Sequence, residues 1–483
     1  MKISSLLSAF LLLFASASCN DQNHSYPPKV SERMIKVENS LAGWVRSGQD
    51  DLWNIEDRMK KYNIKGVSIA VINDYKIEWA KGYGFADVSE QRPVTEKTLF
   101  QAASISKSLN SLAVLKLVQE GKLDLNTDIN KYLVSWKFPY DSRSGGKPVN
   151  LAALLSHTAG LTVHGFPGYE QGKELPSLIQ VLDGKPPANT AAIRSFEEPG
   201  KKYEYSGGGT TISQLLVMDV TGRDYAEYMK KNVLDPLGMI SSSYKQPPSA
   251  EMKGLLATGY KPDGREVKGK YHIYPEQAAA GLWTNPTDLC KYIIETQLAL
   301  EGKSSKVISQ EMTKLRLTPV ALDAGLGTFI NSRVTGSVKY FNHNGGNEGF
   351  SCTSVGSLEG GKGVVVMTNS DNGVLLEEIV NSVAIVYNWK DYYLPENKTV
   401  VNVPENILEK YIGNYDLQGT KAVIKKSGNG LNIRIDPIEW KLNFTTDSDF
   451  FIREYRGNLK FRTGAEGKAE GIIINGILMK KTE

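Results

Sequence analysis

A serine and a lysine three positions apart could carry nucleophilic chemistry in the stretch LFQAASISKSLN, residues 99–110. Side chains at this spacing on a helix lie on one face, about 60° apart around the axis. Ser104 and Lys107 have the spacing, whereas Ser106 and Ser108 each lie one position from the lysine, about 100° round the axis. A partly buried lysine has a lowered pKa and can take part in proton transfer with a neighbouring hydroxyl group. The spacing therefore selects Ser104 as the candidate nucleophile.

The position of Ser104 at a predicted helix start gives a second reason. Leu109, Leu112 and Leu117 follow helical spacing, and Gly121 ends the run. At a helix start, unpaired backbone N–H groups and the positive end of the dipole favour developing negative charge. The pattern alone also fits a helix-capping serine and a surface lysine, so the rest of the chain must decide between the two interpretations.

Strand and helix patterns predict an α+β fold for residues 48–390. Alternating apolar residues in 67–87 predict two strands around a turn at Asn73-Asp74. Helix-like runs follow, a long excursion rich in Gly, Pro and charge covers 162–200, and strands return from 338 to 369 before a last helix. Regular βαβ alternation is absent. We expect an antiparallel sheet flanked by helices, made from both ends of the chain, with a helical region inserted between.

The chain changes its pattern after residue 390. A polar, proline-containing linker is expected at 391–405. Residues 406–483 read as short strands separated by turn residues, which predicts a small all-β domain.

The amino-terminal residues 1–19 have the pattern of a secretory signal peptide, with a basic start, a short apolar core and small residues. The apolar run is too short for a membrane-spanning helix, which needs roughly 20 residues. Ala15-Ser16-Ala17 suits ordinary cleavage, whereas Ser16-Ala17-Ser18-Cys19 resembles a bacterial lipoprotein box with Cys19 as the lipid-carrying residue. Both routes stay open. Residues 20–47 are expected to form a tether and a leading helix, and the protein is expected to be exported, periplasmic or on the outer surface, with lipid anchoring through Cys19 as one route.

Composition excludes several classes of function. The 57 basic and 53 acidic side chains are too evenly balanced and dispersed for a nucleic-acid partner. Cys290 and Cys352 do not make a disulfide scaffold and are expected to be small buried side chains. The histidines have no metal-like spacing, so neither a metal nor a cofactor is expected.

Several longer motifs between residues 48 and 390 occur in the order of one family. They are GYGFADV, TLFQAASISKSLN, LAALLSHTAGL, EPGKKYEYSGGGT, LDPLGMISSSY, AAAGLWTNPTDLCKYI and HNGGNEGFS. Together they resemble the serine beta-lactamase and penicillin-recognising hydrolase family, in its branch of class C beta-lactamases, DD-peptidases, D-aminopeptidases and esterases. The tail resembles the lipocalin-like β-modules behind some of these hydrolases, through ILEKYIGNYDL with Tyr411, Gly413 and Tyr415. Such a module is expected to pack against or shape the rim of the active site, and a barrel with its own ligand is disfavoured.

The resemblance implies catalytic roles for three side chains. Ser104 matches the acylated serine, Lys107 its partner, and Tyr205 the tyrosine that acts with the lysine as general base. Tyr203 is the nearest competitor for that role. His157 belongs to a motif whose role in the family is structural, so it is left out of the catalytic set.

The resemblance also implies how a substrate is held. His343, Asn344 and Gly345 match the third motif, on the strand that edges the active site. The backbone N–H groups of Ser104 and Gly346 match an oxyanion hole, and such donors contribute on the order of 10²–10³ in rate each.

Two departures from the family pattern affect the expected substrate. The second motif reads Tyr205-Ser206-Gly207, where an asparagine is frequent at the third place, and His343 stands where beta-lactamases have lysine. A histidine gives a weaker cation than lysine near neutral pH. We therefore expect an exported serine hydrolase that cleaves an amide or ester, namely a D-amino-acid peptide, a cell-wall fragment or a small ester. The alternatives are a class C type beta-lactamase and a non-catalytic cell-wall peptide binding or sensor protein. The oligomeric state stays open.

Overall fold

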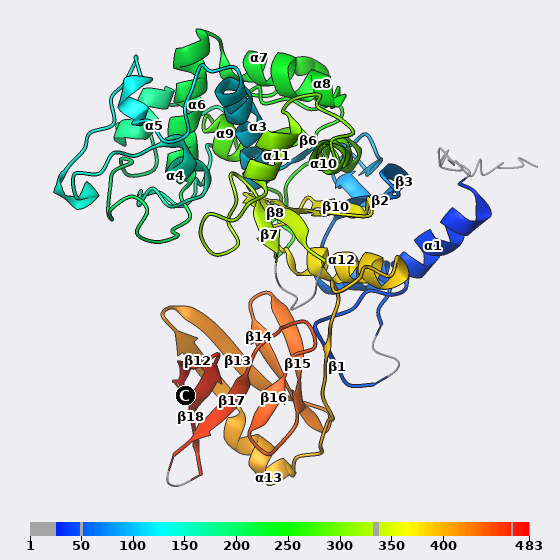
Figure 1. The fold of residues 1–483 in the computed structure, drawn as a ribbon. Coiled ribbons are helices and arrows are strands. Elements are labelled where there is room, and N and C mark those ends of the chain that lie inside the picture. The colour runs from blue at the N-terminus through cyan, green and yellow to red at the C-terminus, as the bar shows by residue number, and fades with distance from the viewer. Residues whose placement is uncertain (1–25, 49–51, 332–337, 465–466, 483) are drawn as a thin grey trace, which may run out of the picture.

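The computed structural model describes residues 26–48, 52–331, 338–464 and 467–482. It has a large domain of sheet and helices and a smaller carboxyl-terminal barrel (Figure 1). The predicted signal peptide 1–19 and the lipidation candidate Cys19 lie outside the described residues. Within those residues, no helix has the length and apolar character needed to cross a membrane.

A seven-stranded antiparallel sheet, in the order β4-β3-β2-β10-β9-β8-β7, forms the centre of the large domain. Its strands are β2 (Gly66–Asn73), β3 (Lys76–Asp87), β4 (Arg92–Pro93), β7 (Phe329–Asn331), β8 (Tyr340–Asn347), β9 (Phe350–Ser357) and β10 (Gly363–Thr368). Strands from both ends of the chain meet where β2 pairs with β10, with Ala70 opposite Val365. The expected α+β fold with a sheet built from both ends is confirmed.

The strand β2 shows how the sheet divides the core into two layers. Successive side chains of a strand point to opposite faces. Ala70 and Ile72 join the cluster that contains helix α3 (Ser106–Gln119) and helix α10 (Pro286–Leu300). Ile69 and Val71 join the cluster that contains helix α12 (Val374–Val386). Helix α1 (Pro28–Glu38) packs beside α12 on that second face.

The region between β4 and β7 is mainly helical, as expected. Besides α3 and α10 it contains α4 (Leu151–Leu155), α5 (Leu178–Asp183), α6 (Gly207–Thr221), α7 (Tyr225–Met229), α8 (Asp235–Leu237), α9 (Gln277–Ala280) and α11 (Gln310–Arg316). Two short strands, β5 (Phe100–Gln101) and β6 (Trp283–Thr284), pair antiparallel within it. The excursion 162–200 is irregular apart from α5. Cys290 and Cys352 are both buried and free, in agreement with the sequence expectation.

The carboxyl-terminal domain is a closed antiparallel barrel in which each strand pairs with the next and the last with the first. Its strands are β12 (Gly413–Leu417), β13 (Thr420–Ser427), β14 (Gly430–Ile435), β15 (Ile438–Phe444), β16 (Asp449–Phe451), β17 (Leu459–Thr463), β18 (Ala469–Ile474) and β19 (Ile477–Lys481). A short helix, α13 (Glu405–Leu408), precedes them. The rings of Tyr411 and Phe461 stack inside with centroids 3.8 Å apart, and Phe444 packs on the same stack. The barrel therefore has an aromatic core, as the predicted all-β module requires.

The linker between the two domains forms a short strand that pairs with the amino-terminal segment. Strand β1 (Val45–Arg46) pairs in parallel with β11 (Glu396–Asn397) of the linker, where the two segments run side by side (Figure 1). The backbone N–H of Val45 also donates to the Arg453 carbonyl of the barrel. Gly43 permits this approach, since a Cβ at that position would lie 2.1 Å from the Arg453 oxygen. The amino-terminal segment thus holds the barrel against the large domain.

A buried arginine adds an ionic contact between the domains. Arg58, on α2 (Ile55–Lys61), donates from Nε to Glu378 of α12 at 2.8 Å. Its Nη2 donates at 2.8 Å to Glu454 of the barrel, which also pairs with Lys61 at 2.7 Å. One guanidinium therefore joins a helix of the large domain to a loop of the small one.

Candidate active site

Ser104 lies in a single 3-10 turn, Ala103–Ile105, that leads into α3. The sequence places the helix start at Ser104, whereas the α-helix begins at Ser106. Ala103 has a φ of 47°, a left-handed conformation that non-glycine residues seldom adopt and that is common at functional sites. The turn before the helix therefore presents the Ser104 side chain from a constrained backbone.

Strand β8 holds this turn from the other side. A Cβ at Gly345 would lie 2.3 Å from the Ala102 carbonyl oxygen and 2.6 Å from the Cys352 sulfur. The Cys352 thiol lies 3.1 Å from the same carbonyl. Gly345 therefore lets β8 lie directly against the backbone before Ser104. This structural role is separate from the substrate-binding role that the motif predicts.

Lys107 lies beneath Ser104, as the spacing predicts. Its Nζ is 3.0 Å from Ser104 Oγ and donates a second hydrogen bond to the Ala279 carbonyl at 2.7 Å. Burial lowers the pKa of Lys107 to about 7, because the charged form is poorly solvated there. Ser106 faces elsewhere, with its Oγ accepting from Leu282 N at 3.0 Å. The geometry thus joins the selected serine, and not Ser106, to a lysine that is partly a free amine at neutral pH.

Tyr205 completes a cluster of three side chains. Tyr205 lines the same cavity as Ser104, and the centroid of its ring lies 5.0 Å from Lys107 Nζ. Burial raises the pKa of Tyr205 to about 12, and the nearby Ser104 hydroxyl group opposes this rise only in part. The phenol is therefore protonated at neutral pH, and Lys107, with a pKa of about 7, is the one of the two groups that has a free base available to accept a proton.

The glycines after Tyr205 allow helix α6 to approach the excursion closely. Ser206 caps the helix by accepting from Gly209 N at 2.9 Å. A Cβ at Gly208 would lie 2.8 Å from the Thr162 carbonyl oxygen, and one at Gly207 would lie 3.0 Å from the Phe166 ring. The run of glycines therefore fixes where the chain enters α6 and, with it, the position of Tyr205.

His157 supports Tyr205 from behind. Helix α4 ends at Leu155, and His157 takes a left-handed φ of 58° that turns the chain. Its ring centroid lies 4.3 Å from that of Tyr205, and its Nδ1 accepts from Ser206 N at 3.2 Å. Burial lowers the pKa of His157 well below its usual range, so the ring stays neutral. The structural role that the family motif implies fits this position.

His343 lies in the cavity as a neutral ring. Its ring centroid is 6.5 Å from that of Tyr205 and 5.1 Å from that of Phe329. Nδ1 donates to the Asn344 carbonyl at 2.7 Å, and Nε2 is buried without a partner among the described residues. Burial, together with the nearby Lys107, lowers the pKa of His343 to about 3. The third motif therefore carries no cation at neutral pH.

The cavity in front of these groups has a volume of about 530 Å³. It is lined by Ser104, Tyr205, Asp323, Phe329, Asn342, His343, Asn344, Gly345 and Gly346. All predicted site residues meet here except Lys107, which lies buried under Ser104, while Tyr203 is absent from the lining. Three lining residues, Asp323, Phe329 and Asn342, were not predicted from the sequence. No motif marks the first two, and Asn342 directly precedes the predicted third motif.

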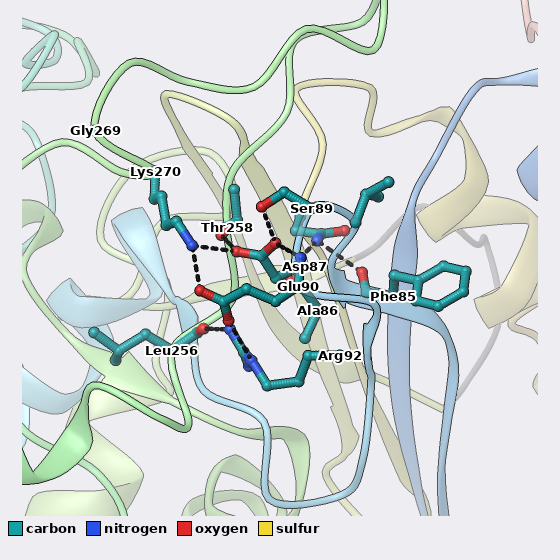
Figure 2. A network of polar contacts seen from close by, with 12 residues as sticks. Phe85, Ala86, Asp87, Ser89, Glu90, Arg92, Leu256, Thr258, Gly269 and Lys270 are labelled. Carbon is teal, nitrogen blue, oxygen red and sulfur yellow. Dashed lines mark hydrogen bonds and ion pairs between the residues drawn. The ribbon is translucent and has the colours of Figure 1, made fainter. Parts of the chain in front are cut away.

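A polar network around Asp87 holds the segment that contains Thr258 and Lys270 (Figure 2). This segment precedes α9, whose Ala279 carbonyl accepts from Lys107. The buried Asp87 carboxylate, at the end of β3, accepts from Thr258 Oγ1 at 2.6 Å, Lys270 Nζ at 2.7 Å and Ser89 Oγ at 2.7 Å. The segment continues to α9, which carries Ala279. Asp87 therefore ties the end of β3 to the segment before α9, and it does not line the cavity.

The comparison with family models decides the membership of the chain. The beta-lactamase family model matches residues 54–382. The chain belongs to the beta-lactamase family. This family of serine hydrolases accounts for the α+β fold and for the order of the motifs, so the resemblance drawn from sequence is confirmed, and the closed barrel fits the expected lipocalin-like module.

Curated relatives in the beta-lactamase family share about a quarter of the aligned residues. Protein flp of Staphylococcus aureus (strain N315) is 27% identical over 353 residues, which cover 70% of this chain and 66% of that protein. The chain thus spans slightly less than two thirds of the length of this relative. Penicillin-binding protein 4* of Bacillus subtilis (strain 168) is 23% identical over 448 residues, covering 86% of this chain and 93% of that protein.

Solved structures share the fold. The octameric penicillin-binding protein homologue from Pyrococcus abyssi has a TM-score of 0.61 at 24% identity and covers 87% of this chain and 96% of its own. The D-amino acid amidase from Ochrobactrum anthropi SV3, complexed with L-phenylalanine amide, has a TM-score of 0.55 at 21% identity and covers 69% and 95%. At these identities the likeness concerns the fold alone.

Proposed function

We propose that the protein is a serine hydrolase that cleaves an ester or amide through an acyl-enzyme on Ser104. One observation carries the proposal: Lys107 Nζ lies 3.0 Å from Ser104 Oγ in a buried place that lowers the lysine pKa to about 7. A hydroxyl group at hydrogen-bond distance from a free amine can act as a nucleophile, with the amine as the base that takes its proton. The beta-lactamase family membership supports the same reaction class.

In the proposed acylation step, Ser104 Oγ attacks the substrate carbonyl carbon and its proton passes to Lys107. The N–H groups of Ser104 and Gly346 receive the oxyanion. The protonated Tyr205 phenol then gives a proton to the leaving amine or alcohol as the bond to the carbonyl carbon breaks, and the lysine returns its proton to the phenol. In deacylation a water molecule attacks the ester, the same groups take its proton, and Ser104 leaves with a proton restored.

The proposed substrate is a D-amino-acid peptide, a cell-wall fragment or a small ester. His343 is neutral at physiological pH, so it offers no fixed cation for the carboxylate that beta-lactams carry. Ser206 and Gly207 supply no side-chain amide after Tyr205. Two relatives bear names that fit amide chemistry, a penicillin-binding protein and a D-amino acid amidase. Beta-lactam hydrolysis is therefore the less favoured activity.

The proposed location is outside the cytoplasm, in the periplasm or on the outer surface. The signal-peptide pattern of residues 1–19 supports export, and Cys19 is the candidate for lipid attachment. Mass analysis of the mature protein from its host tests both: a start after Ala17 supports ordinary cleavage, and a lipid-modified Cys19 supports anchoring.

Active-site labelling tests the hydrolase proposal. A fluorophosphonate probe should label the wild type on Ser104 and leave Ser104→Ala unlabelled. Turnover is then compared on p-nitrophenyl esters, D-alanyl peptides and a chromogenic cephalosporin. Equal labelling of both proteins would refute the proposal, absence of labelling would favour the binding or sensor alternative, and fast cephalosporin turnover would favour the beta-lactamase alternative.

A further inference from the structure

A smaller cavity, of about 270 Å³, meets the active-site cavity around Ser104 at Gly346. Among the described residues, Gly346 alone lines both cavities. It is exposed, and a Cβ at this position would meet no atom within 4 Å, so the space around it is open. Because the Gly346 N–H is the proposed oxyanion donor, a substrate carbonyl group held there lies between the two cavities.

The two halves of a substrate must leave this carbonyl group in different directions. The carbonyl carbon of an ester or amide is planar, with the acyl chain on one side and the leaving group on the other. Tyr205, the proposed proton donor to the leaving group, lines the active-site cavity and not the smaller one. The leaving group therefore belongs beside Tyr205, and the smaller cavity lies on the side of the acyl group.

The excursion 162–200 supplies an apolar wall of the smaller cavity through Phe166 and Pro167. The Phe166 ring is half-buried and Pro167 is exposed. The ring lies against the start of α6, since a Cβ at Gly207 would be 3.0 Å from it. The Pro167 carbonyl accepts from His272 Nδ1 at 2.9 Å, which ties the loop to the segment before α9. The apolar wall is therefore held in place on two sides before a substrate arrives.

Four polar side chains of the other walls already have partners within the protein. The Asn347 amide donates two hydrogen bonds inside the protein, at 2.8 and 3.1 Å. The Tyr274 hydroxyl group accepts from the backbone N–H of Glu348 at 3.1 Å. Glu348 and Asp371 both pair with Lys261, so neither depends on a charged ligand. An uncharged group that packs on the apolar wall of the excursion suits this cavity, because it leaves these contacts intact.

We infer that the smaller cavity is the acyl subsite of the active site, and that Phe166 selects substrates whose acyl half carries a flat apolar group such as a phenyl ring. Aromatic rings pack on one another in offset or edge-to-face contact, and the removal of apolar surface from water favours the contact. The inference rests on the proposed hydrolase function and narrows its substrates to esters and amides of this kind. It assigns the excursion the role of a specificity determinant.

Matched ester pairs test the subsite in the full-length protein. The first pair varies the acyl half: p-nitrophenyl 3-phenylpropanoate and p-nitrophenyl propanoate. The second pair varies the alcohol half: the acetate esters of 2-phenylethanol and of ethanol. We expect kcat/KM to favour the phenyl member of the first pair by about tenfold, the effect of partly burying one phenyl ring. The second pair reports on the active-site cavity, where the leaving group lies.

Two variants and one control locate the effect. Phe166→Ala removes the ring and should reduce the preference in the first pair to about twofold. Phe166→Leu keeps an apolar side chain against α6 but removes the flat ring, and should reduce that preference severalfold. Phe196→Ala is the matched control and should keep it, since Phe196 is a half-buried ring of the same excursion that lines neither cavity. The ratio within a pair cancels a general loss of activity, and far-UV circular dichroism checks that each variant is folded.

The outcomes separate the subsite from the hydrolase proposal. Wild-type protein that is labelled on Ser104 but treats both members of the first pair alike would overturn the subsite alone. A preference that Phe166→Ala and Phe166→Leu both leave unchanged would overturn it as well, and so would a change that is as large in the second pair as in the first. Failure of the fluorophosphonate to label Ser104 refutes the hydrolase proposal, on which the subsite depends.

Discussion

Lys107 Nζ lies 3.0 Å from Ser104 Oγ, and it donates a second hydrogen bond to the uncharged carbonyl of Ala279. Both partners are neutral, so neither strongly stabilises an ammonium in this buried place. Burial lowers the pKa of the lysine to about 7, and no charged partner in the described part of the chain opposes that shift. A charged lysine would have no capacity to accept the proton of Ser104, so its protonation state should control the rate.

We predict that kcat/KM for an ester falls about tenfold per pH unit below pH 7 and levels off above it, because only the free amine of Lys107 accepts a proton. Lys107→Arg should lose roughly 10²–10⁴ in kcat/KM above pH 7, and the loss should narrow on acidification, since an arginine stays charged and the wild-type lysine becomes charged below pH 7. The measurement is a pH–rate profile of the wild type and the variant. A flat profile in the wild type would contradict the role of Lys107 as base.

A second group with a similar pKa needs a control. Burial raises the pKa of Glu276, at the start of α9, to about 7, and Ala279 on that helix bonds to Lys107. Glu276→Gln cannot titrate at this position. If the pH profile of this variant keeps its ionisation near pH 7, the ionisation belongs to Lys107; if it disappears, the assignment to Lys107 is wrong.

We predict that Tyr205→Phe lowers kcat by roughly 10²–10³, because the protonated phenol next to Ser104 is lost as a proton donor to the leaving group. Substrates with a good leaving group, such as p-nitrophenyl esters, should be less affected than amides. Tyr203→Phe is the matched control and should stay within about twofold of the wild type, since Tyr203 does not line the cavity. Equal effects of the two changes would contradict the role of Tyr205.

We predict that Gly345→Ala destabilises the large domain by about 1–3 kcal/mol, because its Cβ would meet the Ala102 carbonyl oxygen at 2.3 Å. The strand would have to move away from the turn before Ser104, so activity should fall as well. Gly254→Ala, where a Cβ would meet no atom within 4 Å, is the control. Thermal unfolding measures both, and a Gly345→Ala protein as stable as the control would show that β8 does not hold the turn.

We predict that Asp87→Asn lowers the free energy of unfolding at neutral pH by roughly 2 kcal/mol, through weaker hydrogen bonds to the network. Burial acts to raise the Asp87 pKa, but the hydrogen bonds from Lys270, Thr258 and Ser89 outweigh it and hold the pKa below its usual range. A depressed carboxyl pKa contributes stability above the unfolded-state pKa, and that stability is lost as the pH falls through the folded-state pKa. The difference between wild type and variant should therefore narrow on acidification, which denaturant unfolding at several pH values can measure.

Local patterns were sufficient for the first two long strands of the sheet and for the placement of Lys107 beside Ser104. The alternation in 67–87 and the helical phase of Ser104 and Lys107 depend on neighbouring residues, and the structure reproduces both. Tyr205 and His343 came from motif resemblance, since nothing local marks one tyrosine or one strand histidine. Tyr205 and His343 lie in the same cavity as Ser104 only because the tertiary fold brings these distant segments together.

Contacts between distant segments could not be read from the chain. The close approach of Gly345 to Ala102 joins residues far apart in sequence, and a glycine in a strand is compatible with many roles. Closure of the barrel depends on pairing of β12 with β19, which no local pattern specifies. The cavity of about 520 Å³ between the two domains is the extreme case, because its walls come from residues 42–44, from residues between 342 and 392, and from Glu454 and Tyr455 of the barrel.

The pairing of β2 with β10 has a consequence for the order in which the protein is made. Residues 66–73 emerge early from the ribosome, and their sheet partner at 363–368 emerges almost three hundred residues later. Ser104 and Lys107, the proposed nucleophile and base, are thus synthesised long before Gly346 and the strand that carries it. A chain interrupted in between would contain Ser104 and Lys107 yet lack strands β8, β9 and β10 of the central sheet, so catalysis should appear only when translation of the whole large domain is complete.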